Sequence, residues 1–93
     1  MKIENPKNYH AVALKMLYEN KKNGVTSLEA CKKRNFFKFT TRLSELRRNY
    51  PKLKIIAIKE SFINALNGID YCNRYFLKNT NKEFTKIYKI VNG

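Results

Sequence analysis

Few side chains in this 93-residue chain have the chemistry of a catalytic or metal site, and those few are not clustered. His10 is the single histidine, and the two cysteines are Cys31 and Cys72. Their spacing does not match that of zinc ligands, and the seven Asp and Glu residues are scattered rather than paired. No glycine-rich phosphate loop is present in the sequence. The sequence therefore predicts a protein that is not an enzyme and that uses no metal or cofactor.

The strongest chemical signal is positive charge. Twenty Lys and Arg face seven Asp and Glu, which gives a formal net charge of +13. Nucleic acid is the partner this charge favours, because neutralised phosphates release condensed counterions; an anionic membrane or an acidic protein surface are the alternatives. No apolar run approaches the roughly 20 residues of a membrane span, and the first ten residues lack the apolar core of a signal peptide. We expect a cytoplasmic protein with reduced cysteines and no membrane contact.

Three helices are expected in the first half of the chain. Apolar residues at helical spacing predict a helix over 8–22. Thr26 to Glu29 has the pattern of a capping box, which predicts a second helix over 26–33. Asn35 suits the positive φ of a tight turn, and a third helix is expected over 37–49. Both the charge and the tight connection point to this third helix as the one that recognises a ligand.

The second half of the chain is predicted to be β structure over 53–91. Alternating apolar residues indicate a first strand beginning at Leu53, and the β-prone run at 84–91 indicates a last one. Between them, Asn67-Gly68 is a strong hairpin signal, and 79–82 is expected to be a loop tip. Residues 1–93 are thus predicted to form a single α+β domain. Its expected architecture is a winged helix-turn-helix with three N-terminal helices followed by a two- to three-stranded antiparallel β wing.

Residues 24–48, GVTSLEACKKRNFFKFTTRLSELRR, resemble a helix-turn-helix domain family found largely in bacteriophage and prophage genes. The family tends to read G-[IV]-T-x-L-[DE]-A, then a short turn, then R-L-A-A-R-[IV]-x-D-L-R. The closing segment 86–90 is similar to the family's last strand. Asn35 replaces a common Gly, Thr40 and Thr41 replace small apolar residues, and the connection at 60–82 is longer than the usual wing. The resemblance implies DNA binding by the helix-turn-helix.

A recognition helix inserts its N-terminal half into the major groove, so residues there are the candidates for reading bases. Lys38 and Thr41 lie on the predicted outer face, where a Lys can contact guanine and a Thr can meet a thymine methyl. Simple solvent exposure is the alternative for both. Arg42 lies at the border of the apolar face; it either contacts DNA or pairs with Glu45 or Glu29, a pair worth about 0.3–0.5 kcal/mol if exposed.

Other basic residues are candidates for holding phosphates. They lie on the end of the second helix, on the end of the third helix and on the wing, which is expected either to cover a minor groove or to form a dimer edge. These candidates are Lys32, Lys33, Arg34, Arg47, Arg48, Arg74 and Lys78.

Two functions follow from these patterns. The first is a duplex DNA-binding transcriptional regulator of a phage or mobile element, associated with the nucleoid of a bacterial host cell and acting as a monomer or a wing-mediated homodimer. The alternative is a winged-helix protein that binds and modulates a host protein, such as a polymerase subunit or a defence factor. RNA binding would instead be indicated by a preference for RNA hairpins or single strands over duplex DNA.

Overall fold

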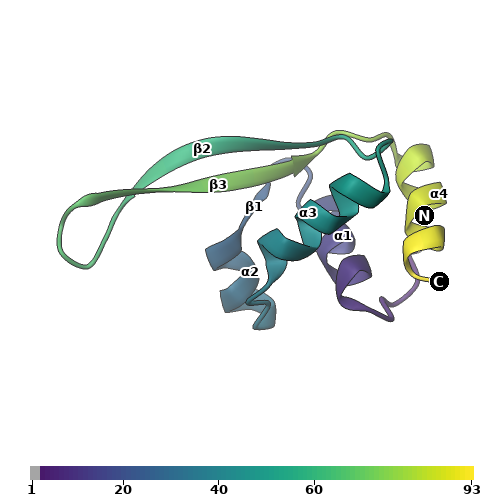
Figure 1. Cartoon of the computed structure of the whole chain (residues 1–93), viewed down its shortest axis with the longest axis horizontal. Helices are drawn as coiled ribbons and strands as arrows, with labels where there is room; N and C mark the ends of the chain where they lie inside the picture. The colour runs from purple at the N-terminus through teal and green to yellow at the C-terminus, as the bar shows by residue number, and fades with distance from the viewer. Residues whose placement is uncertain (1–2) are drawn as a thin grey trace.

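The computed structural model describes residues 3–93, except for the side chain of Arg34. Its elements follow in the order α1 (Tyr9–Glu19), β1 (Val25–Thr26), α2 (Ser27–Arg34), α3 (Phe39–Asn49), β2 (Ile55–Ile63), β3 (Ile69–Leu77) and α4 (Asn81–Val91). The described part of the chain is therefore α+β, as predicted, with four helices and one three-stranded antiparallel sheet. Figure 1 shows a helical body from which the β2–β3 hairpin projects well beyond α2.

The sheet has the strand order β1-β3-β2. β2 and β3 pair from Ile55–Leu77 to Ile63–Ile69 in one unbroken register. Asn67 adopts a left-handed φ of 60° in the connecting turn, which confirms the hairpin predicted at Asn67-Gly68. We call residues 60–73, the outer part of this hairpin, the arm. The short strand β1, which the sequence patterns did not predict, pairs with the inner part of β3.

The core lies where α1, α3 and α4 meet the inner end of the sheet. The ring of Phe39 in α3 meets the edge of Tyr75 in β3, with centroids 6.1 Å apart. On the other side of α1, Phe84 in α4 stacks on Tyr18 at 4.0 Å. Each fully buried apolar side chain of this size contributes about 1.5–3 kcal/mol. The largest of them are Phe39, Phe84, Leu14, Leu17, Leu43, Leu46 and Leu77.

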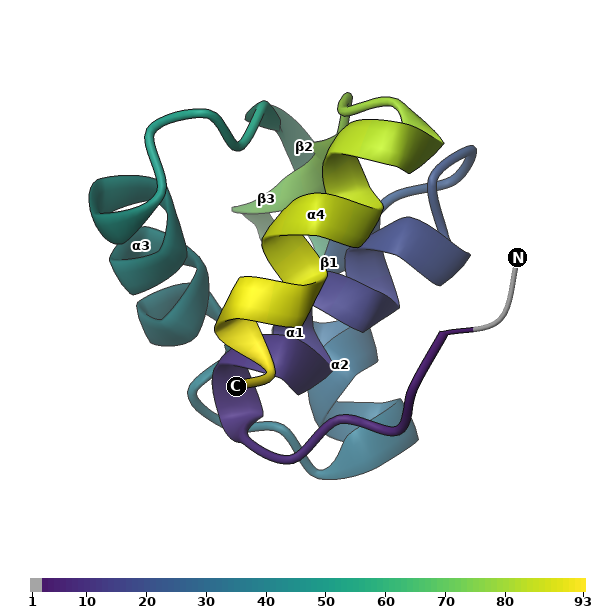
Figure 2. The same cartoon turned by 90° about the vertical axis from the view of Figure 1, so that its right-hand side faces the viewer.

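The last element is a helix, so the strand predicted over 84–91 was wrong. A capping box starts α4: the Glu83 amide donates to the Thr80 hydroxyl (3.2 Å), and the Thr80 amide donates to the Glu83 carboxylate (2.9 Å). The buried residues Phe84, Ile87, Tyr88 and Val91 then recur at helical spacing. The aromatic and β-branched composition suggested a strand, but strand propensity is weaker than a buried helical face. Figure 2 shows α4 lying against α1.

Several predicted boundaries also change. α1 covers Tyr9–Glu19 rather than 8–22. The Asn8 side chain caps its start by accepting from the Ala11 amide at 2.8 Å, and Asn20 is its C-terminal cap. α3 starts at Phe39 rather than at 37, since the turn after α2 needs four residues, and it ends at Asn49 as predicted. The β hairpin covers 55–77 rather than 53–91. None of the helices within residues 3–93 is long and apolar enough to cross a membrane.

The predicted loop tip at 79–82 is instead the connection into α4, and Asn79 anchors it. This side chain is fully buried. Its Oδ1 accepts from the Lys54 amide at 2.7 Å, and its Nδ2 donates to the Lys52 carbonyl at 3.0 Å. Asn79 therefore joins the segment before β2 to the segment after β3.

Replacing Asn79 with Ala is expected to destabilise the protein by about 1–3 kcal/mol, because the Lys54 amide and the Lys52 carbonyl lose their partner in two partly buried hydrogen bonds. Denaturant unfolding of both proteins measures this difference. Asn73→Ala, on an exposed side chain of β3, serves as the control and should change stability by less than about 0.5 kcal/mol. Equal effects of the two substitutions would contradict this role of Asn79.

Candidate nucleic-acid interface

α2 and α3 are joined by a tight turn that sets the orientation of α3. The predicted capping box of α2 is confirmed: the Glu29 amide donates to the Thr26 hydroxyl, and the Thr26 amide donates to the Glu29 carboxylate. At the other end, Asn35 has a φ of 53° and its amide donates to the carbonyls of the last turn. Asn tolerates this left-handed geometry better than most residues. Four residues, 35–38, then lead directly into α3.

One face of α3 is buried and the opposite face is exposed. Phe39, Leu43 and Leu46 fill the core. Six residues from Lys38 to Arg48 are exposed, and all of them carry hydroxyl or cationic side chains: Lys38, Thr40, Thr41, Ser44, Arg47 and Arg48. Arg42 and the Glu45 carboxylate are half-buried and pair with each other beside these residues. Of the predicted residues, Thr41, Arg47 and Arg48 thus lie on α3, and Lys38 directly precedes its first turn.

A shallow cleft adjoins the N-terminal end of α3. It has a volume of about 320 Å³ and is lined by Tyr9, Asn35, Phe36, Phe37, Lys38 and Arg42. Phe37 is 79% exposed. Phe36 is buried against the rings of Tyr9 and Phe39, with centroids 5.5 Å and 5.7 Å away. The aromatic packing of Phe36 holds the turn in place while Lys38 stays accessible.

Arg42 makes an internal contact rather than extending from α3. Its guanidinium lies 2.7 Å from the Glu45 carboxylate one turn later, and His10 of α1 lies 2.9 Å from the same carboxylate oxygen. The hydrogen bond from Arg42, followed by that from His10, lowers the pKa of Glu45. Of the alternatives open for Arg42, the structure contains the pair with Glu45. The Arg42–Glu45 pair lies within α3, and the contact of His10 with Glu45 joins α1 to α3.

The phosphate-holding candidates differ in how available they are. Lys32 and Lys33 on α2 and Arg47 and Arg48 on α3 are all exposed. The last two lie in the final turn of α3, where the helix dipole favours cations. The side chain of Arg34 lies outside the described residues. Lys78 is exposed but lies at the inner end of the hairpin, with its ammonium 5.3 Å from the Phe76 ring. Lys82 falls within the segment predicted to be β wing, but it belongs to α4.

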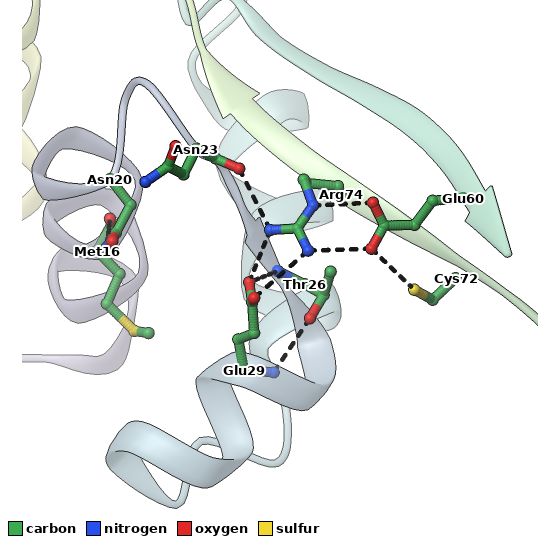
Figure 3. Close-up of polar contacts among 8 residues, drawn as sticks. All are labelled: Met16, Asn20, Asn23, Thr26, Glu29, Glu60, Cys72 and Arg74. Atoms are coloured by element: carbon green, nitrogen blue, oxygen red, sulfur yellow. Dashed lines mark hydrogen bonds and ion pairs between the residues drawn. The ribbon is translucent and has the colours of Figure 1, made fainter. Parts of the chain in front are cut away.

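Arg74 is held at the centre of an ion-pair cluster (Figure 3). Its guanidinium contacts the Glu60 carboxylate on the neighbouring strand and the Glu29 carboxylate on α2, each at 2.9 Å. It also donates to the Asn23 carbonyl at 3.2 Å. With its nitrogens engaged in this way, Arg74 connects the hairpin to the start of α2. Its structural role is to fix the direction of the hairpin relative to the helices.

The cluster shifts the pKa of each member. The hydrogen bonds from Arg74 lower the pKa of Glu60. Partial burial alone would raise the pKa of Glu29, but the hydrogen bonds from the Thr26 amide and from Arg74 outweigh it, so the pKa is lowered. Glu60 and then Glu29 raise the pKa of Arg74. All three groups therefore stay ionised at neutral pH.

These shifts predict an acid-dependent contribution to stability. A carboxylate whose pKa is lower in the folded state stabilises the fold above its unfolded pKa, and that stability is lost as the pH falls through the folded pKa. We expect Arg74→Met to lose less stability than the wild type between about pH 7 and about pH 3. Arg48→Met removes the same charge from an exposed site and should follow the wild-type curve. Parallel curves for all three proteins, from unfolding experiments across this range, would contradict the role of the cluster.

Sequence patterns predicted the Arg42–Glu45 pair but missed the partners of Arg74. Glu60 lies 14 residues before Arg74, and no motif connects them; only the register of β2 and β3 brings them together. Within residues 3–93, no group of three His, Cys, Asp or Glu side chains is arranged to hold a metal. Cys31 and Cys72 are free thiols. No family model, curated protein or solved structure matches this chain.

Proposed function

We propose that this chain is a duplex DNA-binding protein with a winged helix-turn-helix architecture, in which α3 enters the major groove. The element order α1-β1-α2-α3-β2-β3 and the strand order β1-β3-β2 support this architecture. A short α2 joined by a tight turn to an amphipathic α3 is the arrangement in which a helix-turn-helix presents its second helix to DNA. The resemblance of residues 24–48 to a phage-associated family suggests a transcriptional regulator of a phage or mobile element.

The observation that carries the proposal is the unbalanced charge on the exposed face of α2 and α3. The carboxylates of these helices are Glu29 and Glu45, and each already pairs with an internal arginine. By contrast, no hydrogen bond or ion pair within the described residues holds the side chains of Lys38, Arg47 or Arg48. Within residues 3–93 these cations have no anionic partner, and phosphates would supply one.

We assign base contacts and phosphate contacts to these residues from their positions along α3. Lys38 and Thr41 lie at its N-terminal end and read base edges. Arg47 and Arg48 at its C-terminal end, together with Lys32 and Lys33 of α2, contact phosphates and fix the register. Arg42 and Arg74 act as positioning residues, because their guanidinium groups are engaged with carboxylates.

Amide chemical-shift mapping by NMR tests this assignment. When a short duplex is added, the largest shifts are expected in residues 32–33 and 38–48, and the arm is expected to change little. Shifts confined to the arm or to α4 would contradict the proposal. RNA hairpins and single strands, titrated in the same way, should produce smaller shifts than the duplex at equal concentration.

A further inference from the structure

Phe37 is a large apolar side chain that extends into solvent beside the start of α3. It lies in the turn after α2, one residue before Lys38, which is the N-terminal cap residue of α3. With 79% of its surface exposed, it is the most exposed aromatic residue within residues 3–93. In this part of the chain its ring packs on no other aromatic ring and lies under no cation.

The structural roles that an apolar residue usually has at this position are not filled by Phe37. An apolar residue just before a helix cap often packs on the fourth residue of the helix and fixes the entry of the chain. In α3 the fourth residue is Arg42, whose guanidinium is engaged with Glu45 at 2.7 Å. The neighbouring Phe36 covers the turn instead, because it is buried and packs on two other aromatic rings. The fold therefore leaves the Phe37 ring available to a ligand.

The surroundings of Phe37 are cationic. Residues 32–44 contain five Lys and Arg and no Asp or Glu. The adjacent Lys38 is exposed, and no ion pair or hydrogen bond within the described residues holds its ammonium. Single exposed apolar residues are common on proteins and do not by themselves mark a binding surface. An exposed ring next to an unpaired cation is more specific, because its partner must offer an apolar group and negative charge side by side.

The major groove of duplex DNA offers both. Its phosphates neutralise cations, and the 5-methyl group of thymine is an apolar group on the floor of the groove that Phe side chains contact. The N-terminal half of a recognition helix lies closest to the base edges. Phe37 adjoins that end of α3 and lines the same cleft as Lys38. A ring at this position is therefore placed to meet a base edge when Lys38 does.

We propose that Phe37 is a specificity-determining residue that contacts the 5-methyl group of a thymine, next to the base pair that Lys38 reads. This inference rests on the proposed function and adds one base to its recognition. Thr41, one turn further along α3, also carries a methyl group. The ring of Phe37 presents the larger apolar surface, and it lies before the first turn of the helix, at the end that enters the groove.

Deoxyuridine substitution tests this contact, because it removes the thymine methyl and leaves base pairing unchanged. A preferred site is first selected from random duplexes with the wild-type protein, and each thymine in that site is then replaced in turn. The replacement next to the base pair whose discrimination depends on Lys38 should weaken wild-type binding roughly fourfold, the effect of one buried methyl group. Phe37→Ala should bind the thymine and deoxyuridine sites equally, since the contact is already lost.

Ile90→Ala is the matched control. It shortens another exposed apolar side chain, on α4, and should keep the full wild-type response to deoxyuridine. Circular dichroism should show that both variants keep the wild-type fold, because both side chains are exposed. A methyl effect as large in Phe37→Ala as in the wild type assigns the thymine to another residue, such as Thr41, and overturns the inference.

Two further outcomes overturn the inference alone. One is a wild type that binds duplex DNA without preferring any sequence, and the other is a selected site that tolerates deoxyuridine at every thymine. In both cases salt-dependent duplex binding remains, and the proposed function stands. Absence of duplex binding at low salt refutes the proposed function itself, and the inference with it.

Discussion

Lys38→Ala is expected to weaken binding to a selected DNA site by about 1–3 kcal/mol and to reduce discrimination against sites with a changed base pair. Lys38 precedes the first turn of α3, is exposed, and borders the open cleft. Its ammonium is therefore free to reach a guanine edge when the N-terminal end of α3 lies in the groove. Fluorescence anisotropy with the selected site and with single-base variants of it measures both effects.

The matched control for this substitution is Lys22→Ala. It removes the same unit of charge from an exposed residue in the turn after α1. Figure 2 shows this turn on the opposite side of the view from α3. This variant should keep the wild-type preference among sites. If Lys38→Ala behaves like Lys22→Ala, with equal losses for matched and mismatched sites, Lys38 does not read bases.

Phe84→Ala is expected to destabilise the protein by about 3–5 kcal/mol. The Phe84 side chain is 1% exposed, and its ring stacks on Tyr18 at 4.0 Å and on Tyr88 at 5.3 Å. Removing it opens a cavity between α1 and α4. Denaturant unfolding monitored by circular dichroism measures the change in the free energy of unfolding.

Ile90→Ala is the control that separates a helix from a strand in this segment. In α4 Ile90 points to solvent, and its truncation should cost less than about 0.5 kcal/mol. In a strand over 84–91, Phe84 and Ile90 would share one face, and the two truncations would have similar effects. Similar large losses for both variants would contradict the helical structure of this segment.

The first half of the fold was predictable because its signals are local. The capping box at Thr26 and the turn at Asn35 each act over a few residues, and the helices over 27–34 and 39–49 follow them closely. The hairpin turn at Asn67-Gly68 was predicted correctly for the same reason, because its signal lies in two adjacent residues. A second capping box at Thr80 was equally local but was masked by the strand-like composition after it. Recognising the same pattern twice would have predicted α4.

The site was predictable only in part, because its internal pairs depend on tertiary structure. The apolar residues of α3 recur at helical spacing, and this period can be read from the sequence. It predicts that the residues outside the apolar face are exposed, as observed for Lys38, Thr41, Arg47 and Arg48. The engagement of Arg74 with Glu29 and Glu60 depends on strand register and on how the hairpin lies over α2. His10 meets Glu45 only through the packing of α1 on α3. No spacing rule in a single sequence connects residues this far apart.

The most direct test of the central claim is the salt dependence of binding to a random duplex, measured by fluorescence anisotropy. The four cations proposed to contact phosphates are Lys32, Lys33, Arg47 and Arg48. If each neutralises one phosphate, the expected log–log slope is about −3.6, from about 0.9 per phosphate. Arg47→Ala/Arg48→Ala should reduce the steepness of that slope by about two units. Micromolar binding with this dependence is the result we predict. No binding at low salt, or a slope unchanged in the variant, would contradict DNA recognition by α3.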